Sequence, residues 1–286
     1  MIPGYILASL WGAIGGFALL IGGFFGCKYN ISERTIAITI AFSSGLLISA
    51  VSFEILYEAY TYGNLYIITL GFIIGIVGFT LIDVFISKLS IKKKSDINLD
   101  ENKGNISEYA GGCDKRVFGE INSNNGINSV TNKYSDFNKY QVQGLITFAG
   151  ALLDGIPEAI AIGLVFFIGG PLSIALVCVV FIANIFEGAS ASLYMRIGGW
   201  KYKNILGLWI CVVVLTAISA MSSYIIFSQT DNYIISGALA VSAGSILAMI
   251  SSTMLPQAFE ENHEYNGFIM GIGFLVSFVL SHLSFH

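Results

Sequence analysis

Four polar residues lie in long apolar stretches of the chain where charge is otherwise scarce: Asp154, Glu158, Asn184 and Glu187. Asp154 and Glu158 are four residues apart, so on a helix both face the same side. Asn184 and Glu187 are three apart and also share a face. If the two helices pack together, two or three carboxylates meet, and they cannot all ionise unaided. The pattern predicts a metal or proton site, and the alternative is a structural hydrogen-bonded cluster.

A proline and a run of small residues accompany these side chains. Pro157 lies between the two carboxylates of the first stretch, where it removes one backbone hydrogen bond and frees the carbonyl of Leu153. A kink with a free carbonyl beside two carboxylates would make a cradle for a cation. In the second stretch, Gly188–Ser192 follow directly after the glutamate, and such small residues let another helix come close.

The stretches that carry these residues are membrane spans. The 286 residues are 55% hydrophobic and only 11% charged, with a mean hydropathy of +0.75, whereas a soluble domain is roughly 25% charged. About 20 apolar residues cross a bilayer, and in lipid such runs are helical because the backbone must satisfy its own hydrogen bonds. We therefore predict an all-α integral membrane protein with eight transmembrane helices. The predicted spans are Gly4–Gly26, Thr35–Tyr57, Tyr66–Ser87, Val142–Ile168, Leu172–Met195, Ile205–Ser228, Tyr233–Leu255 and Gly267–Leu283.

The stretch 88–140 interrupts this pattern. It is rich in Asn, Ser, Lys and Asp and has few aliphatic residues, which predicts a solvated, largely disordered loop. The loop is either a plain linker or a regulatory or metal-sensing segment, although it has no His. The expected organisation is a single membrane domain, with spans one to three in residues 1–87 and spans four to eight in residues 141–286.

The basic residues predict the orientation. All 14 Lys and Arg lie in the connections after the first, third and fifth spans, which are on one side of the membrane. By the positive-inside rule that side is the cytoplasm. We expect a multi-pass protein of the plasma membrane with both termini outside and the 88–140 loop inside. The sequence shows no basic groove with interleaved aromatic residues, so we expect no nucleic-acid partner.

Two pairs of spans resemble each other. Ser44–Ala59 in the second span aligns with Ala243–Ala258 in the seventh, so that Gly45 matches Gly244. The fourth and fifth spans also align around their acidic residues. Both pairs run in opposite directions, as inverted repeats do in many transporters. The predicted layout is a 3+2+3 inverted-repeat bundle.

Other reactive residues have plainer interpretations. Glu54, Glu58 and Asp83 lie nearer to span ends, and we expect interfacial carboxylates there. The cysteines are far apart and form no CxxC pair, so we expect buried apolar side chains rather than a disulfide or zinc site. The cysteines are Cys27, Cys113, Cys178 and Cys211.

These motifs resemble those of the ZIP family of divalent-metal transporters, particularly its bacterial branch. There the fourth span reads H-N-x-P-E-G and the fifth reads [HQ]-N-x-P-E-G, where this chain has D-G-I-P-E-A from Asp154 and A-N-I-F-E-G from Ala183. The second span, SGLLISAVSFEILYEA, resembles the family's small-residue span that ends in an acidic turn. The seventh, AGSILAMISSTMLP, resembles its A-G-x-x-x-x-x-[IV]-x-x-E-x-x-P segment. The resemblance extends over all eight spans.

The resemblance implies metal ligands on the fourth and fifth spans, at two adjacent sites. By position it makes Glu158, Glu187 and Asn184 ligands, and Asp154 stands where the family has His. Several other family ligands are absent, which removes ligands from the second site. Gly155 replaces an Asn, Ala183 a His or Gln, and Thr253 an acidic residue, and residues 205–228 contain no acid.

The resemblance implies transport of a divalent ion into the cytoplasm, with no tightly bound cofactor. The ion is zinc, or manganese or iron, since carboxylates favour harder ions than imidazole does. The implied partners are the ion and the bilayer, and the Gly-rich first and third spans permit a homodimer. Without a Walker or H-E-x-x-H motif, neither a nucleotide-driven pump nor a zinc protease is expected. The alternative is a degenerate, non-transporting relative with a structural or metal-sensing role.

Overall fold

The computed structural model describes residues 3–29, 31–101, 148, 150–152, 155–168, 172–261 and 264–284. Within these residues all regular structure is helical and there is no strand. Seven helices are long and apolar enough to cross a membrane, and an eighth apolar helix, Asn266–His282, is shorter. The expected helical class is confirmed, and the set of apolar helices is that of a multi-pass membrane protein.

The helices begin and end close to the predicted spans, with one clear difference at the third. Helix α4 continues to Glu101, past Lys88, where the sequence predicted a loop. Residues 102–147 lie outside the described residues, so the loop and its boundaries there stay a prediction. The labelled elements are α1 (Gly4–Lys28), α2 (Glu33–Ala50), η1 (Val51–Ile55), α3 (Leu56–Tyr62), α4 (Leu65–Glu101), α6 (Leu172–Ile197), α7 (Tyr202–Phe227), α8 (Asn232–Met249), η3 (Ile250–Met254), α9 (Leu255–Glu261) and α10 (Asn266–Ser284). Between α4 and α6 lies the helical fourth span, Gly150–Ile168.

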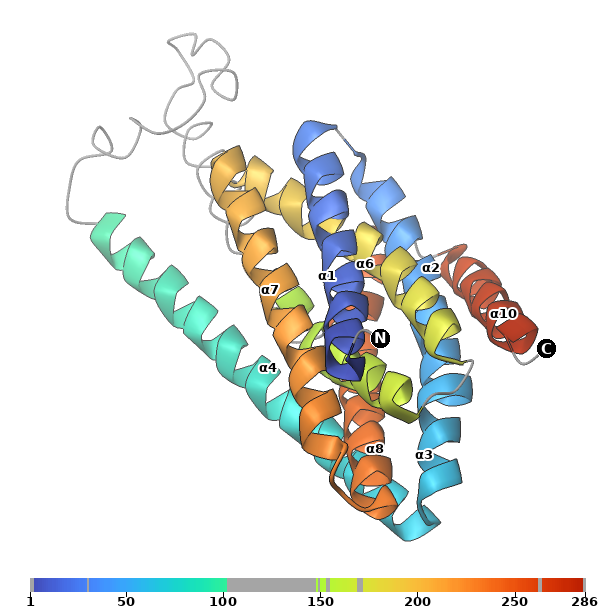
Figure 1. Cartoon of the computed structure of the whole chain (residues 1–286). Helices are drawn as coiled ribbons and strands as arrows, with labels where there is room; N and C mark the ends of the chain where they lie inside the picture. Colours follow the sequence, from blue (N-terminus) through green and yellow to red (C-terminus); the bar gives the residue numbers. More distant parts are fainter. Residues whose placement is uncertain are drawn as a thin grey trace, which may run out of the picture.

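The helices pack in groups that Figure 1 makes visible. Helix α1 lies along α6 and α7, α2 lies along α10, and α4 lies along α8. Contacts between α2 and α6 and between α3 and α8 join these groups. The candidate residues of α6 are therefore covered by α1 on one side and by α2 on another.

Glycines allow α1 to lie directly against α6. A Cβ on Gly22 would meet the backbone of Ile185, and one on Gly26 would meet the backbone of Ala189. A Cβ on Gly188 would likewise meet the backbone of α1, 2.9 Å from a backbone atom of Leu19. This is the close approach that the small residues after Glu187 predicted, and it fixes α6 against α1.

Two π-helices occupy matching positions in the chain. In η1 (Val51–Ile55) and η3 (Ile250–Met254) one extra residue enters the helical turn. Each follows an α-helix and precedes a short one, so the second and seventh spans have the same internal construction. The offset between the two π-helices is the one that aligned Gly45 with Gly244 in the sequence.

Matched glycines also make matched contacts. Each lies so close to a helix of the other half that a Cβ would meet its backbone. Gly45 lies against Met270 of α10 and Gly244 against Phe72 of α4, while Gly75 lies against Val241 of α8 and Gly273 against Phe42 of α2. Span two therefore packs on span eight as span seven packs on span three.

The surface that would face lipid is apolar. Large side chains are well exposed on α4, with Ile74 at 61% and Phe85 at 62%. Two cysteines belong to this surface, since Cys178 and Cys211 are exposed, whereas Cys27 is buried. The expectation of buried cysteines is wrong for these two, because their faces of α6 and α7 are not covered by another described helix.

Candidate metal site

Glu158 is the most deeply buried of the three predicted ligands that the structure describes. It lies in the part of the fourth span that begins at Gly155, and 2% of it is exposed. Neither of its carboxylate oxygens makes a hydrogen bond of normal geometry with the described residues, although the amide of Asn184 lies close enough to interact with them. A buried carboxylate with both oxygens unsatisfied is rare, because each unpaired polar atom is costly away from water.

Helix α6 places two polar side chains against this carboxylate. The charge of Glu187 acts on Glu158, and the side chain of Asn184 also lies beside it. Asn184 is 3% exposed and Glu187 is 8% exposed. The three residues that the sequence placed on two helical faces therefore come together at one interface.

A hydrogen bond to α1 orients the amide of Asn184. Its Nδ2 donates to the backbone oxygen of Gly15 at 3.1 Å. The bond crosses from α6 to the Gly-rich helix that packs on it, and a Cβ on Gly15 would lie 3.7 Å from Ile162 of the fourth span. The glycines of α1 thus bring three helices together around the candidate site.

Asp154 lies outside the described residues, so its position as a ligand stays a prediction. The neighbouring Gly155 lies near Thr216 of α7, and a Cβ added to Gly155 would be 3.3 Å from Thr216 Cγ2. Within the described part of the chain, no three His, Cys, Asp or Glu side chains gather closely enough to hold a metal ion. The described oxygen donors are therefore two carboxylates and one amide, and a three-carboxylate site requires Asp154.

The carboxylates of the second span are buried, which the sequence did not predict. Glu54 is 0% exposed and Glu58 is 6% exposed, so the expectation of interfacial side chains is wrong for both. Glu54 lies in η1, where Ser281 of α10 donates a hydrogen bond to its Oε1. Asp83, on α4, is half-buried. Packing against α10 and α8 covers the second span, and span length alone does not reveal this.

A second contact that sequence reasoning missed joins α9 to α6. The amide Nε2 of Gln257 donates to Ser190 Oγ at 2.9 Å. Ser190 belongs to the small-residue run after Glu187, which we interpreted only as a packing surface. The signal in the sequence was a single Gln following Pro256 in an apolar span.

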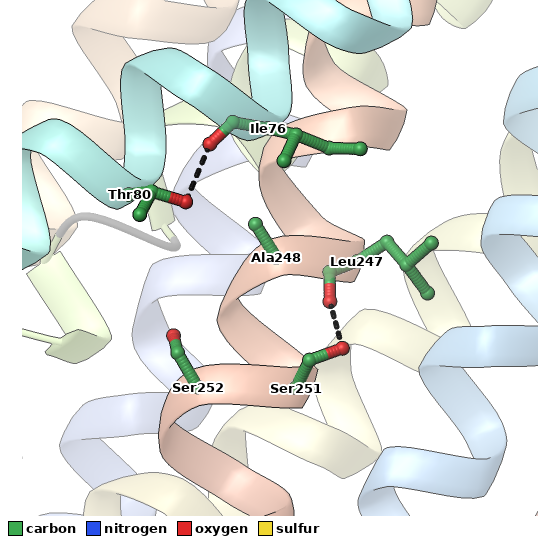
Figure 2. A pocket seen from close by; sticks show the side chains of 6 residues that line it. All are labelled: Ile76, Thr80, Leu247, Ala248, Ser251 and Ser252. Atoms are coloured by element: carbon green, nitrogen blue, oxygen red, sulfur yellow. Dashed lines mark hydrogen bonds between the residues drawn. The ribbon is translucent and has the colours of Figure 1, made fainter.

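A pocket of about 300 Å³ lies elsewhere, between α4 and the α8–η3 span. Figure 2 shows that two of its hydroxyl groups are bound to their own helices: Thr80 donates to the oxygen of Ile76 at 2.7 Å and Ser251 to that of Leu247 at 2.9 Å. Its lining has no titratable side chain, so the pocket is not the predicted metal site. The lining residues are Ile76, Thr80, Leu247, Ala248, Ser251 and Ser252.

The site can hold a cation by simple electrostatics. Two buried carboxylates side by side repel each other, and a bound cation removes this repulsion while it coordinates the oxygens of Glu158. An amide beside them adds a neutral oxygen donor.

Compared with known proteins, the chain matches no protein-family model and no curated protein.

Proposed function

We propose that this protein is a divalent metal-ion transporter that moves its ion across the membrane into the cytoplasm. The ion passes through a site between the fourth span and α6, formed by Glu158, Asn184 and Glu187 with Asp154 as a further ligand. One observation carries the proposal: neither oxygen of the buried Glu158 makes a hydrogen bond of normal geometry, and beside them lie only the amide of Asn184 and a second carboxylate. A purely structural cluster would satisfy both oxygens with well-formed hydrogen bonds, whereas the amide that lies beside them, Asn184, donates to the backbone of Gly15.

The donor set favours a hard ion. All proposed ligands bind through oxygen. Carboxylate and carbonyl oxygens suit Mn²⁺, whereas sites that select Zn²⁺ are rich in imidazole. Zinc and iron remain substrates within the same class, since zinc also accepts carboxylate ligands. The ion is cargo in this proposal and not a resident cofactor.

The same proposal includes a 3+2+3 inverted repeat with both termini outside the plasma membrane. It is supported by the matched π-helices η1 and η3 and by the exchanged glycine contacts. Inverted repeats place substrate sites at the centre of the membrane, between the repeats. The fourth span and α6 form the central pair.

A non-transporting relative is the second candidate. It is favoured by the absence of ligands that the family motif contains, with Ala183 in α6 and Thr253 in η3. Such a protein would bind metal weakly or not at all and would act as a structural or sensing partner. Metal binding and transport separate the two candidates.

Uptake into liposomes tests the proposal. The purified protein is reconstituted, and uptake of Zn²⁺, Mn²⁺, Fe²⁺, Co²⁺ and Cd²⁺ is measured for the wild type and for Glu158→Gln and Glu187→Gln. We expect both substitutions to lower uptake at least about 10-fold, since even indirect changes around metal ligands have effects of about 10- to 100-fold.

The matched control is Glu264→Gln, which removes an exposed carboxylate outside the spans. We expect it to transport as the wild type does. Wild-type protein that transports none of the five ions would favour the non-transporting relative. Equal uptake of Zn²⁺ and Mn²⁺ at matched low concentration would contradict the preference for a hard ion.

A further inference from the structure

A second polar site lies between η1 and α10. Glu54 is 0% exposed, and its Oε1 accepts a hydrogen bond from Ser281. Its Oε2 has no partner in the described residues, and neither has the hydroxyl of Ser277, which is also 0% exposed. Ser277 and Ser281 are four residues apart, so both lie on the same face of α10. One buried carboxyl and two buried hydroxyls thus belong to one interface with unsatisfied polar atoms.

Aromatic rings line one edge of this interface. Phe53, the neighbour of Glu54 in η1, packs on Phe274 at 5.9 Å and on Phe278 at 5.1 Å between ring centroids. These contacts show that the face of α10 bearing residues 274, 278 and 281 is turned toward η1. The rings place apolar surface along one edge of the interface to which Glu54 belongs.

Few charged groups can neutralise Glu54. On α3 the titratable groups nearest in sequence are Tyr57 and Glu58, on α8 there is Tyr233, and on α10 His282, which is exposed and stacks on Phe278. Helix α2 carries Glu33 and Arg34 only in its first turn, about 30 Å along the helix from Glu54. Among the described helices that pack on η1, none has a Lys or Arg nearer to Glu54 than Arg34. An ionised carboxylate in such a place is so costly that the group takes up a proton instead.

We propose that Glu54, Ser277 and Ser281 form a proton-binding site in which Glu54 is a neutral carboxylic acid. Ser281 donates to Oε1, and the proton held on Oε2 is donated to the hydroxyl of Ser277. This one proton gives both unpaired atoms a partner and removes the buried charge. The proton is a ligand of this site, which uses none of the candidate metal ligands.

The other half of the molecule carries the same residue types in exchanged places. Thr253 in η3 matches Glu54 in η1, at the offset that relates the two π-helices. Asp83 in α4 matches Ser281 in α10, at the offset that relates Gly75 to Gly273. A carboxyl and a hydroxyl therefore recur at the matching sequence positions, with the two residue types exchanged. Asp83 is half-buried, and only the Glu54 position is closed from its surroundings.

Infrared spectroscopy of the reconstituted protein at about pH 7 tests the proposal, because only a protonated carboxyl has an acid C=O stretching band and a free Glu would be ionised at this pH. We expect the wild type to show an acid band that is lost in Glu54→Gln. In Ser281→Ala the band should persist and shift to higher frequency, because the hydrogen bond to Oε1 is lost. The control Glu264→Gln should leave the band unchanged.

Two results would overturn the proposal. If Glu54→Gln removes a carboxylate band and no acid band, Glu54 is ionised in the protein. If the Glu54 signal responds to added Na⁺ or Mn²⁺, the site holds a metal cation and not a proton. The measurement needs no transport, so failure of the proposed transport function would leave this inference standing, and the reverse is also true.

Discussion

At the scale of single residues, two buried carboxyls have different surroundings. Glu158 faces a second carboxylate and an amide from α6, whereas Glu54 meets a serine hydroxyl from α10. A pair of carboxylates attracts a divalent cation because one such ion neutralises both negative charges, and protons compete with it for the same oxygens. A single carboxyl between hydroxyls is satisfied by one proton. The neighbours, and not the residue type, therefore separate the two proposed roles.

Transport should weaken in acid. Metal ligands must lose their protons before they bind, so protons compete with the ion for the oxygens of Glu158 and Glu187. We expect initial uptake at sub-saturating metal to fall as the outside pH is lowered from about 8 to about 5, with a smaller fall when the metal is saturating. A flat profile at low metal concentration would contradict a carboxylate site.

The amide of Asn184 gives a second test at this scale. Asn184→Ala removes an oxygen donor and the hydrogen bond to Gly15, and we expect the KM for the ion to rise about 10-fold or more. Asn184→Asp keeps an oxygen donor and should retain more uptake than the alanine variant. Equal uptake by wild type and Asn184→Ala would exclude the amide as a ligand.

At the scale of helices, glycine contacts fix how the site is assembled. Helix α1 reaches α6 only because Gly22 and Gly26 have no side chain at the contact. The hydrogen bond from Asn184 to α1 depends on this approach. The π-helices add a second local device, because an extra residue in a turn changes which side chains face the neighbouring helix. The Glu54 site lies within one of them.

The α1–α6 contact can be tested by adding one methyl group. In Gly22→Ala the new Cβ would press on the backbone of Ile185, and such overpacking costs about 1–3 kcal/mol. We expect a lower melting temperature for the purified protein in detergent. The control is Gly207→Ala on α7, where an added Cβ meets nothing within 4 Å and alanine favours the helix by up to about 1 kcal/mol. Equal melting temperatures for the two variants would contradict the close contact.

At the scale of the whole molecule, two spans of the helical bundle share an internal construction, which is what the proposed inverted repeat requires. The second and seventh spans each contain a π-helix and each pack on the third span of the opposite half. Helix α4 extends past its membrane span to Glu101. With the proposed orientation this extension points into the cytoplasm, together with the connections that carry all Lys and Arg residues.

Cysteine labelling tests this orientation. In a variant whose native cysteines are replaced by serine, Gln229→Cys places a thiol in the connection after α7, and Tyr29→Cys places one after α1. We expect a membrane-impermeant maleimide to label Gln229→Cys on intact cells and Tyr29→Cys only after permeabilisation. The opposite pattern would invert the topology and place the termini in the cytoplasm.

The sequence by itself determined the helices and the faces of the polar residues. Span length and apolar composition are local properties, so α1 begins at Gly4 as predicted. The three- and four-residue spacings depend only on the geometry of a helix, and this is why Glu158, Asn184 and Glu187 were found without a structure. The metal, the inverted repeat and the orientation remain predictions, and Asp154 lies outside the described residues.

Only the tertiary structure decided which surfaces are covered. Burial depends on the neighbour that packs on a face, so Glu54 and Glu58 proved buried although they lie toward a span end, and Cys178 and Cys211 proved exposed within apolar spans. The π-helices are equally invisible in the sequence, because one extra residue in a turn leaves the apolar pattern of a fully apolar span unchanged. The pairing of Glu54 with Ser281 joins residues far apart in the chain, and only the packing of α2 on α10 could bring them together.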